Sequence, residues 1–229
     1  MSSSEFSTNC PEQTIGAATW QKILQVKPSP VSDVLHSRGF HAQVMRHDIQ
    51  PLAGAMRLSG IARTMLSRPL VGKPAAGKEY ELLFGAIDTL RPGEVLVTDE
   101  MGCCVWGELC SEVATKKGSN GIVIDGFSRD VEDIKRLGFP VYCRGRHMSD
   151  MLYHRMITGV NEPVLCGGVA VWPGDLILGS EDGVVVVPAT VIDEVTEEAY
   201  LKTQTESVVR RALREGMSVS DAYKRFGAI

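Results

Sequence analysis

Residues 121–134 read GIVIDGFSRDVEDI and place four acidic side chains around one arginine, directly after an apolar run. The apolar run at residues 121–124 predicts a short buried strand. The acidic stretch that follows predicts a helix over residues 130–137, which Gly138 would end. A buried strand that leads directly into a helix is typical of an α/β sheet, so these residues indicate the fold class.

The same alternation continues on both sides of this stretch. The turn Arg91-Pro92-Gly93 separates a helical pattern from a strand pattern, and Gly118 ends the next helical pattern. We expect strands at residues 57–65, 94–97, 121–124 and 140–142, and helices at residues 79–90, 106–117 and 130–137. This β-α-β-α-β order with short connections predicts a sheet whose strands pack under helices.

The segment after Pro163 and the two ends of the chain follow other patterns. Short β-rich runs, separated by Pro173-Gly174-Asp175 and Glu181-Asp182-Gly183, predict a small antiparallel unit. A helix is expected to begin at the cap Ser32-Asp33 and to stop at Gly39. Further amphipathic helices are expected at residues 191–215 and 220–226.

These patterns divide the chain into three parts. Residues 1–28 form an N-terminal extension with a weakly helical patch, and residues 29–189 form one α/β domain. Residues 190–229 form a C-terminal helical segment that is expected to pack on the domain or on a neighbouring subunit.

Composition narrows the classes of function. The 229 residues suffice for a substantial core, and 44% hydrophobic with 23% charged residues is typical of a globular chain. A formal net charge of -4 gives no basic surface for nucleic acid. The sequence has no apolar run of the roughly 18 to 20 residues that a membrane helix needs, and MSSSEFSTNC at the start does not resemble a signal peptide. We expect no membrane association and a cytoplasmic location.

The cysteines and histidines show no pattern of a metal site. None of the six cysteines forms a C-x-x-C pair, so buried free thiols are expected. A reactive Cys103-Cys104 pair is the alternative, although no histidine lies near it in the sequence to lower a thiol pKa. The five histidines are expected on the surface or at partner contacts.

Arg129 and Asp130 follow the central strand at the point where open α/β sheets bind ligands. Asp130 at a helix start can also be a plain N-cap, with Glu132 and Asp133 complementing the helix dipole. The positive charge of Arg129 interacts unfavourably with that dipole, which indicates that a negatively charged partner lies nearby. The planar guanidinium group of Arg129 suits the oxygens of a 2-oxo acid. A salt bridge from Arg129 to Asp99 or Glu100 is the structural alternative.

The preceding helix opens with a second feature of this kind. Gly107 carries no Cβ and lets a ligand approach the backbone, and the free N–H groups of Glu108, Leu109 and Cys110 would attract an anion. Adjacent strand-to-helix junctions lie side by side in such a sheet. Both helix starts are therefore expected to face one small anionic ligand.

Taken together, these residues carry a resemblance. The order Trp106-Gly107-Glu108, then 20 residues, then Arg129-Asp130 and, after two more, Asp133 resembles the signature of the RraA-like family. That family includes class II 4-hydroxy-4-methyl-2-oxoglutarate / 4-carboxy-4-hydroxy-2-oxoadipate aldolases and regulators of ribonuclease activity A. The resemblance implies a β/β/α sandwich of the swivelling-domain type, assembled as trimers or hexamers with sites between subunits.

The resemblance also implies roles for single residues. Asp130 would ligate Mg²⁺ or Mn²⁺, with waters in the other positions, and Arg129 would bind the oxygens of the 2-oxo acid. The backbone N–H groups from Gly107 to Cys110 would hold the substrate carboxylate. Glu108 would act in catalysis by positioning water next to the ion. Asp133 matches the last acid of the signature and would reach the ion through water, although its place in the first helical turn also suits a structural role.

The implied function is a metal-dependent lyase. Retro-aldol cleavage of a 4-hydroxy-2-oxo acid would release pyruvate, and oxaloacetate decarboxylation would pass through the same pyruvate enolate. The alternative is a non-catalytic regulator that binds a partner protein such as a ribonuclease. Retention of the whole spaced pattern favours the lyase.

Some features of the chain extend or depart from this resemblance. Met101-Gly102-Cys103-Cys104 replaces a stretch that is often glycine-rich and polar, and the N-terminal extension is longer than usual. Arg144, Arg146 and His147 form a small basic cluster that could bind a distal carboxylate. A homo-oligomer is expected, partly from apolar residues of the C-terminal helix, namely Val191, Val195, Val208, Val209, Ala212 and Leu213.

Overall fold

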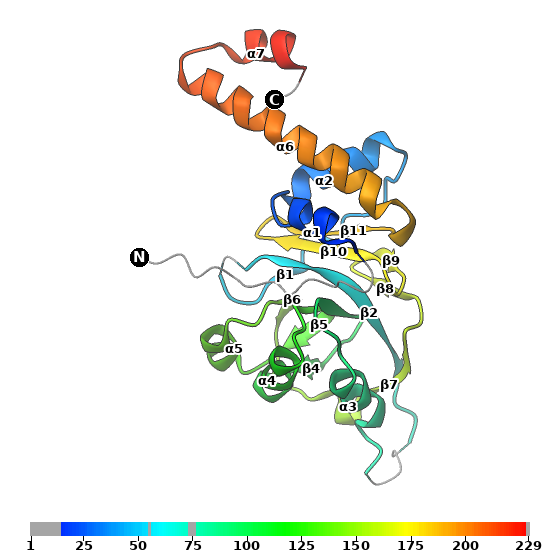
Figure 1. Ribbon diagram of the computed structural model, residues 1–229. Helices are drawn as coiled ribbons and strands as arrows, with labels where there is room; N and C mark the ends of the chain where they lie inside the picture. The colour runs from blue at the N-terminus through cyan, green and yellow to red at the C-terminus, as the bar shows by residue number, and fades with distance from the viewer. Residues whose placement is uncertain (1–14, 55, 73–76, 228–229) are drawn as a thin grey trace.

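A computed structural model describes residues 15–54, 56–72 and 77–227. The strands are β1 (Gln50–Pro51), β2 (Leu58–Pro69), β3 (Glu94–Thr98), β4 (Cys104–Trp106), β5 (Gly121–Ser128), β6 (Val141–Arg146), β7 (Arg155–Val160), β8 (Val164–Cys166), β9 (Val169–Val171), β10 (Leu176–Ser180) and β11 (Gly183–Val187). The helices are α1 (Ala17–Ile23), α2 (Pro28–Ser37), α3 (Glu81–Asp88), α4 (Glu108–Lys116), α5 (Val131–Leu137), α6 (Ile192–Arg214) and α7 (Val219–Phe226), with 3-10 turns at Met151–Tyr153 and Ala189–Val191. Figure 1 shows the sheet between two groups of helices.

The main sheet has the order β1-β6-β5-β3-β2-β10-β11, with β4 paired to β5 and β7 paired to β2. Strands β6, β5, β3 and β2 run parallel to one another, whereas β1 and β10 pair antiparallel with the outer two of them. Helix α4 connects β4 to β5, and α5 connects β5 to β6. The predicted alternation of strands and helices is therefore confirmed, and the α/β class with it.

One expectation about local structure is confirmed and extended, and another is wrong. The strands after Pro163 do pair antiparallel, β8 with β9 and β10 with β11, and β10 also pairs antiparallel with β2, which joins this hairpin to the main sheet. Helix α2 begins at Pro28, where a proline is tolerated because the first-turn N–H groups have no partner within the helix, so Ser32 lies inside the helix. Gly39 does follow the end of α2, with a φ of 88°.

Buried side chains alternate between cores on the two faces of the sheet. On β11, Val184 and Val186 face the core that includes the β8–β9 hairpin, whereas Val185 and Val187 face the core under α1, α2 and α6. A third core packs β5 residues such as Ile122 against α3, α4 and α5. Since successive strand residues point to opposite faces, a strand covered on both sides is apolar throughout, which explains the run GVVVV.

Helices α1 and α6 pack together on the core that lies under α1, α2 and α6. Trp20 and Ile23 of α1 share that core with Val195 and Ala199 of α6. Helix α6 then extends beyond the body and carries α7 at its far end (Figure 1). Val195 and Val209 are buried within the chain, while Val208 is 51% exposed, so only part of the apolar character of α6 is left for another subunit.

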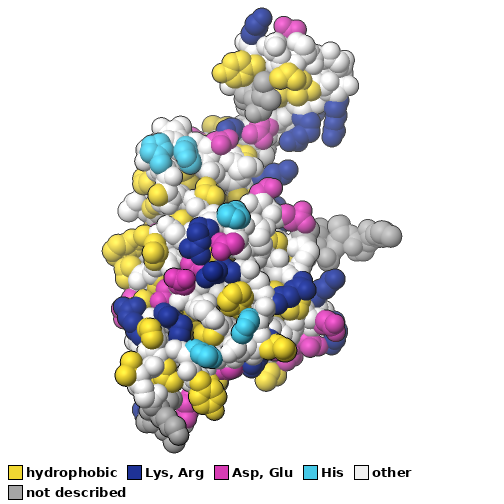
Figure 2. All heavy atoms as spheres, turned by 180° about the vertical axis from the view of Figure 1, so that it is seen from behind, with side chains coloured by type: hydrophobic (Ala, Val, Ile, Leu, Met, Phe, Trp, Pro, Cys, Tyr) yellow, Lys and Arg dark blue, Asp and Glu magenta, His cyan; other side chains and the backbone are white. Residues whose placement is uncertain are grey.

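The predicted division of the chain stays a prediction, and residues 1–14 of the expected extension lie outside the described residues. Among the described residues, no helix combines the length and the apolar character needed to cross a membrane. Figure 2 shows one face on which basic and acidic side chains are intermixed rather than separated into areas of one sign. This face offers no basic stripe of the kind that follows a nucleic-acid backbone.

Candidate active site

The junctions that precede α4 and α5 are held side by side by β4. This short strand was not predicted, and its last residue, Trp106, pairs with Ser128 at the end of β5. The carbonyl of Trp106 accepts hydrogen bonds from the backbone N–H of Arg129 at 3.1 Å and from the Ser128 hydroxyl at 3.0 Å. The two junctions therefore lie side by side, as expected, whereas a shared anionic ligand stays a prediction.

Asp130 has a left-handed backbone, with φ 57° and ψ 40°, although it is not a glycine. Such a conformation costs a non-glycine residue on the order of 1 kcal/mol, less for Asp than for most residues, and is enriched at functional sites. Its side chain makes no capping hydrogen bond to its own helix α5. Instead, Oδ2 of Asp130 accepts the backbone N–H of Glu108 at 3.2 Å, so the carboxylate lies at the start of the neighbouring helix α4.

Gly107 makes this close approach possible. A Cβ at position 107 would lie 2.4 Å from Oδ2 of Asp130, which is too close for any side chain. The backbone of Gly107 is extended, with φ -145°, so the requirement for glycine is one of space alone. The prediction that a ligand approaches the backbone at Gly107 stays a prediction, and the group that approaches it in this structure is the Asp130 carboxylate.

The guanidinium of Arg129 lies between two carboxylates. Its Nη2 is 3.1 Å from Oδ2 of Asp150, and its Nε is 3.9 Å from Oδ2 of Asp130. The expected alternative partners are wrong, because Asp99 pairs with Arg155 and Glu100 pairs with Arg144. About two fifths of the side chains of both Arg129 and Asp130 are exposed, so both can reach a ligand.

Asp150 and Tyr80 belong to this site and were missed in the sequence. The Tyr80 hydroxyl donates to Oδ1 of Asp150 at 2.6 Å, and the backbone N–H of Leu152 donates to the same oxygen at 2.9 Å. Burial and the neighbouring carboxylate raise the pKa of Tyr80, so the phenol stays protonated and remains a donor. Only one weak signal was available, namely that Asp150 caps the 3-10 turn that follows it.

A pocket of about 280 Å³ opens over these groups. Its lining comprises Tyr80, Leu83, Phe84, Cys104, Val105, Trp106, Gly107, Leu109, Cys110, Arg129, Asp130, Asp150 and Met151. Of the predicted site residues, Gly107, Leu109, Cys110, Arg129 and Asp130 are therefore brought together. Glu108 contributes its N–H but does not line the pocket, and the carboxylate of Asp133 pairs with Arg136 at 3.0 Å.

The donor groups fit a hard divalent cation with a shell made mostly of water. In residues 15–54, 56–72 and 77–227, no three His, Cys, Asp or Glu side chains gather as a ligand set. Asp150 is engaged by Arg129 and Tyr80, whereas no hydrogen bond reaches Oδ1 of Asp130 from the described residues. One carboxylate beside an open pocket suits Mg²⁺ or Mn²⁺, because such ions keep several waters.

The cysteines at the pocket are unsuited to nucleophilic or metal-binding roles. Burial raises the pKa of the Cys104 and Cys110 thiols, which keeps both protonated. Cys103 is also buried, and its pKa is raised for the same reason. The expectation of buried free thiols holds for Cys103, Cys104, Cys143 and Cys166, whereas Cys110 is a half-buried free thiol and Cys10 lies outside the described residues.

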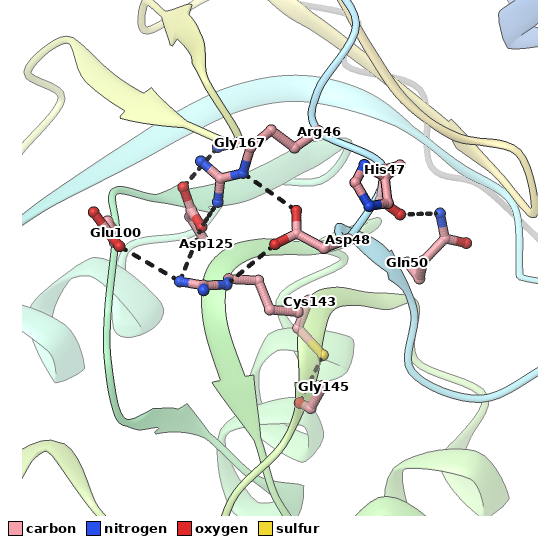
Figure 3. Close-up of polar contacts among 10 residues, drawn as sticks. Arg46, His47, Asp48, Gln50, Glu100, Asp125, Cys143, Gly145 and Gly167 are labelled. Carbon is pink, nitrogen blue, oxygen red and sulfur yellow. Dashed lines mark hydrogen bonds and ion pairs between the residues drawn. The ribbon is translucent and has the colours of Figure 1, made fainter.

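A second polar cluster lies at the middle of β5 and is distinct from the pocket (Figure 3). We call it the Asp125 cluster; its members are Arg46, Asp48, Glu100, Asp125 and Arg144. Arg46 donates to Oδ1 of Asp125 at 2.7 Å, and the backbone N–H of Gly167 donates to Oδ2 at 2.8 Å. Arg144 lies 3.4 Å from Asp48 and 3.8 Å from Asp125.

The predicted basic cluster therefore does not face the pocket. Arg144 is engaged in the Asp125 cluster, and Arg146 donates to the carbonyl of Leu52 at 3.4 Å. The His147 ring packs at a tilt against Phe127. All five histidines are exposed, as expected.

Comparison with known proteins identifies the family of this chain. A family model described as RraA-like (Aldolase/RraA) matches residues 29–186. The chain belongs to the RraA-like family. The β/β/α sandwich expected from the resemblance is confirmed by solved RraA-like structures, one of which is Streptomyces coelicolor RraAS2, described as an unusual member of the RNase ES inhibitor RraA protein family. It superposes with a TM-score of 0.76 at 26% identity, over 86% of this chain and 97% of that one.

Curated relatives of this RraA-like chain differ in length and name. A candidate 4-hydroxy-4-methyl-2-oxoglutarate aldolase of Halalkalibacterium halodurans is 33% identical over 178 residues, which cover 76% of this chain and 80% of the relative. Protein DlpA of Legionella pneumophila is 28% identical over 205 residues. That match covers 88% of this chain but only 32% of DlpA, so the RraA-like chain spans about a third of that relative.

Proposed function

We propose that this RraA-like protein is a divalent-metal-dependent lyase that cleaves a 4-hydroxy-2-oxo acid by retro-aldol reaction and releases pyruvate. One observation carries the proposal: Arg129, Asp130 and the start of α4 converge on one pocket. A guanidinium and backbone N–H groups suit the oxygens of a 2-oxo-carboxylate, and a carboxylate with a free oxygen suits the divalent cation that would accompany it. The relative named as a candidate aldolase supports the same class of reaction.

Each residue has a stated task in this proposal. Asp130 would hold Mg²⁺ or Mn²⁺ through its free oxygen, and the bound ion would supply Lewis-acid polarisation of the 2-oxo group. Arg129 would bind the 2-oxo oxygen, and the N–H groups of Leu109 and Cys110 would hold the C1 carboxylate. The N–H of Glu108 is already used by Asp130, so the predicted set of three backbone donors is reduced to two.

The bond changes follow from this placement. Removal of the C4 hydroxyl proton lets the C3–C4 bond break, which forms the carbonyl group of the leaving fragment. The electron pair of that bond moves onto the 2-oxo oxygen as an enolate, whose charge Arg129 would stabilise as it forms. Glu108, at the first position of α4, would take up the hydroxyl proton through a water. The same proton, returned from Glu108 through that water to C3 of the enolate, then gives pyruvate.

The same site would decarboxylate oxaloacetate. Loss of CO₂ from its β-carbon yields the same pyruvate enolate, so the same charges stabilise both reactions. Decarboxylation requires no base for a hydroxyl proton. We therefore expect Glu108→Gln to slow aldol cleavage more than decarboxylation, and Glu112→Gln, one turn further along α4 and outside the pocket lining, to affect neither.

The test is pyruvate formation by the purified protein with Mg²⁺ or Mn²⁺ and a panel of 4-hydroxy-2-oxo acids. Metal-dependent release above the metal-only rate, abolished by a chelator, is the expected result. A rate that never exceeds the metal-only rate, with oxaloacetate included, would contradict the proposal. It would favour a non-catalytic role as a regulator of a partner protein such as a ribonuclease, in line with the description of RraAS2.

The proposal extends to assembly and location. We place the protein in the cytoplasm, as a homotrimer or a hexamer built from trimers. Exposed apolar side chains next to the pocket, among them Phe84 and Leu109, support a subunit contact near the site. Light scattering that shows a stable monomer at micromolar concentration would contradict the assembly.

A further inference from the structure

Arg129 lies between two carboxylates at unequal distances. Its Nη2 is 3.1 Å from Oδ2 of Asp150, whereas its Nε is 3.9 Å from Oδ2 of Asp130. The first distance is close to the roughly 2.7 to 2.9 Å of a charge-assisted hydrogen bond, and the second is about 1 Å too long for one. The guanidinium is therefore held by Asp150 and stops just short of contact with Asp130.

Asp150 is fixed by contacts with three other parts of the chain. Its main chain is attached to β4, because the N–H of Cys104 donates to the carbonyl of the residue before Asp150 at 2.8 Å. Oδ1 of Asp150 accepts the Tyr80 hydroxyl at 2.6 Å and the N–H of Leu152 at 2.9 Å, while Oδ2 faces Arg129. Both oxygens are thus acceptors. An asparagine would not replace this carboxylate, since its amide nitrogen would face one of the two sets of donors.

The two carboxylates compete for one guanidinium. Asp130 and Asp150 are the acidic side chains among the described residues that line the pocket, and Arg129 directly precedes Asp130 in the chain. Without the Asp150 carboxylate, the guanidinium would need to move by only about 1 Å to pair with Asp130. That pair would bring a positive charge to the carboxylate that is proposed to bind a divalent cation. Because like charges repel, direct pairing of Arg129 with Asp130 would weaken cation binding.

We propose that Asp150 is a positioning residue that holds Arg129 away from Asp130. The Asp130 carboxylate thereby stays available to a divalent cation, and the guanidinium stays in place for the 2-oxo oxygen. This inference rests on the proposed function for the identity of the two ligands. Its consequence for cation binding is measurable without any substrate, so it is tested apart from the reaction.

The affinity of the purified, metal-free protein for Mn²⁺ provides the first test, with the free ion measured by electron paramagnetic resonance. Asp150→Ser removes the carboxylate but keeps a hydroxyl that suits the N-cap of the Met151–Tyr153 turn. We expect its Kd for Mn²⁺ to rise about tenfold, the scale found when a residue that orients a metal ligand is replaced. The melting temperature checks that the fold is intact. An unchanged Kd in folded Asp150→Ser would overturn the inference, while the proposed function would stand.

Asp48→Ser is the matched control. The Asp48 side chain is 35% exposed against 31% for Asp150, and it also pairs with arginine side chains. It belongs to the Asp125 cluster and does not line the pocket. Its Kd for Mn²⁺ should equal that of the wild type. An equal rise in both variants would show that the loss of any negative charge lowers the affinity, and it would overturn the inference.

A double variant separates the positioning of Arg129 from the charge of Asp150 itself. In Arg129→Ala there is no guanidinium to hold, so adding Asp150→Ser should change the Kd for Mn²⁺ by less than about twofold. The double variant should therefore bind Mn²⁺ more tightly than Asp150→Ser alone. A further tenfold loss in the Arg129→Ala background would show that Asp150 attracts the cation by its own charge, and the inference would be overturned. If the wild type binds no Mn²⁺ at millimolar concentration, the cation site of the proposed function fails and this inference fails with it.

Discussion

Strand β5 contributes to two clusters of arginines and carboxylates that behave differently. Asp125, in the middle of the strand, belongs to the Asp125 cluster (Figure 3), and Asp130 follows the end of the strand at the pocket. The Asp125 side chain is 2% exposed, and both of its oxygens accept hydrogen bonds. The Asp130 side chain is 43% exposed, its backbone is left-handed, and only one of its oxygens is engaged by the described residues.

The difference shows how residues of the same kind serve stability in one place and a ligand in another. A buried carboxylate is stable only if it is paired and hydrogen-bonded, and the Asp125 cluster meets this condition within the chain. At the Asp130 site, one carboxylate oxygen has no hydrogen bond from the described residues. The backbone of Asp130 is left-handed, and this conformation directs the carboxylate toward Gly107. The two clusters contain the same types of residue. What distinguishes them is that the hydrogen bonds of Asp125 are complete within the chain, whereas Asp130 has a strained backbone and one carboxylate oxygen without a partner among the described residues.

The largest expected effect is on activity at Asp130. Asp130→Gly should reduce kcat/KM for pyruvate release by about 10³-fold, because the proposed ion loses its carboxylate and the enolate loses that charge stabilisation. The melting temperature should stay the same or rise, since glycine adopts φ 57° without strain. Both quantities are measured on the same preparation. A variant that keeps wild-type metal-stimulated turnover would contradict the role of Asp130.

The opposite result is expected at Asp125. Asp125→Ala leaves Nη2 of Arg46 and the buried N–H of Gly167 without their acceptor, although Nε of Arg46 keeps Asp48, and should lower the free energy of unfolding by about 3 kcal/mol, which is roughly 6 to 12 °C in melting temperature. Activity per folded molecule should remain near that of the wild type at a temperature where the variant is folded. Asp48→Ala is the control, because Asp48 is more exposed and should cost less than about 1 kcal/mol. Equal losses in both variants would show that burial of Asp125 is not what matters.

Their position after β5 marked Asp130 and Arg129 as candidate site residues, and the family resemblance supplied their proposed roles. Apolar periodicity located the strand, and the edge of an α/β sheet where ligands bind follows from chain direction. Tyr80 and Asp150 were missed because they are 70 residues apart and meet only through tertiary packing. The same reason hid the pairing of β10 with β2, in which Leu178 lies opposite Ser59. Local sequence patterns predict helices, strands and the junctions between them. Contacts between residues that are distant in the sequence can be identified only once the three-dimensional fold is known.

A smaller effect on activity is expected at Gly107. Gly107→Ala would put a Cβ 2.4 Å from Oδ2 of Asp130, so the carboxylate must move away from the N–H of Glu108. A displacement of this size should lower kcat/KM by about 10²-fold, because small errors in the position of a catalytic group are costly. Gly102→Ala is the matched control, since a Cβ there meets nothing within 4 Å. Equal activity of both variants would show that the contact between Gly107 and Asp130 has no role in the reaction.

The smallest effect is expected at Tyr80, which contacts Asp150 rather than the proposed ion. Tyr80→Phe removes the phenol that donates to Oδ1 of Asp150, but the N–H of Leu152 still holds the same oxygen and Phe84 can still stack on the ring. Arg129 should therefore become slightly less well positioned, with kcat/KM lower by about threefold to tenfold, the equivalent of one hydrogen bond, and with most of the change in KM.

The pKa of Tyr80 is raised, first by burial and then by its hydrogen bond to Asp150, so the phenol stays protonated throughout the range in which a free tyrosine begins to ionise. Profiles of kcat/KM between pH 6 and pH 10 should consequently have the same shape in the wild type and in Tyr80→Phe, separated by a constant factor. An alkaline decline that is present in the wild type and absent from the variant would mean that the phenol ionises in this range and that its role is more direct than the positioning of Asp150.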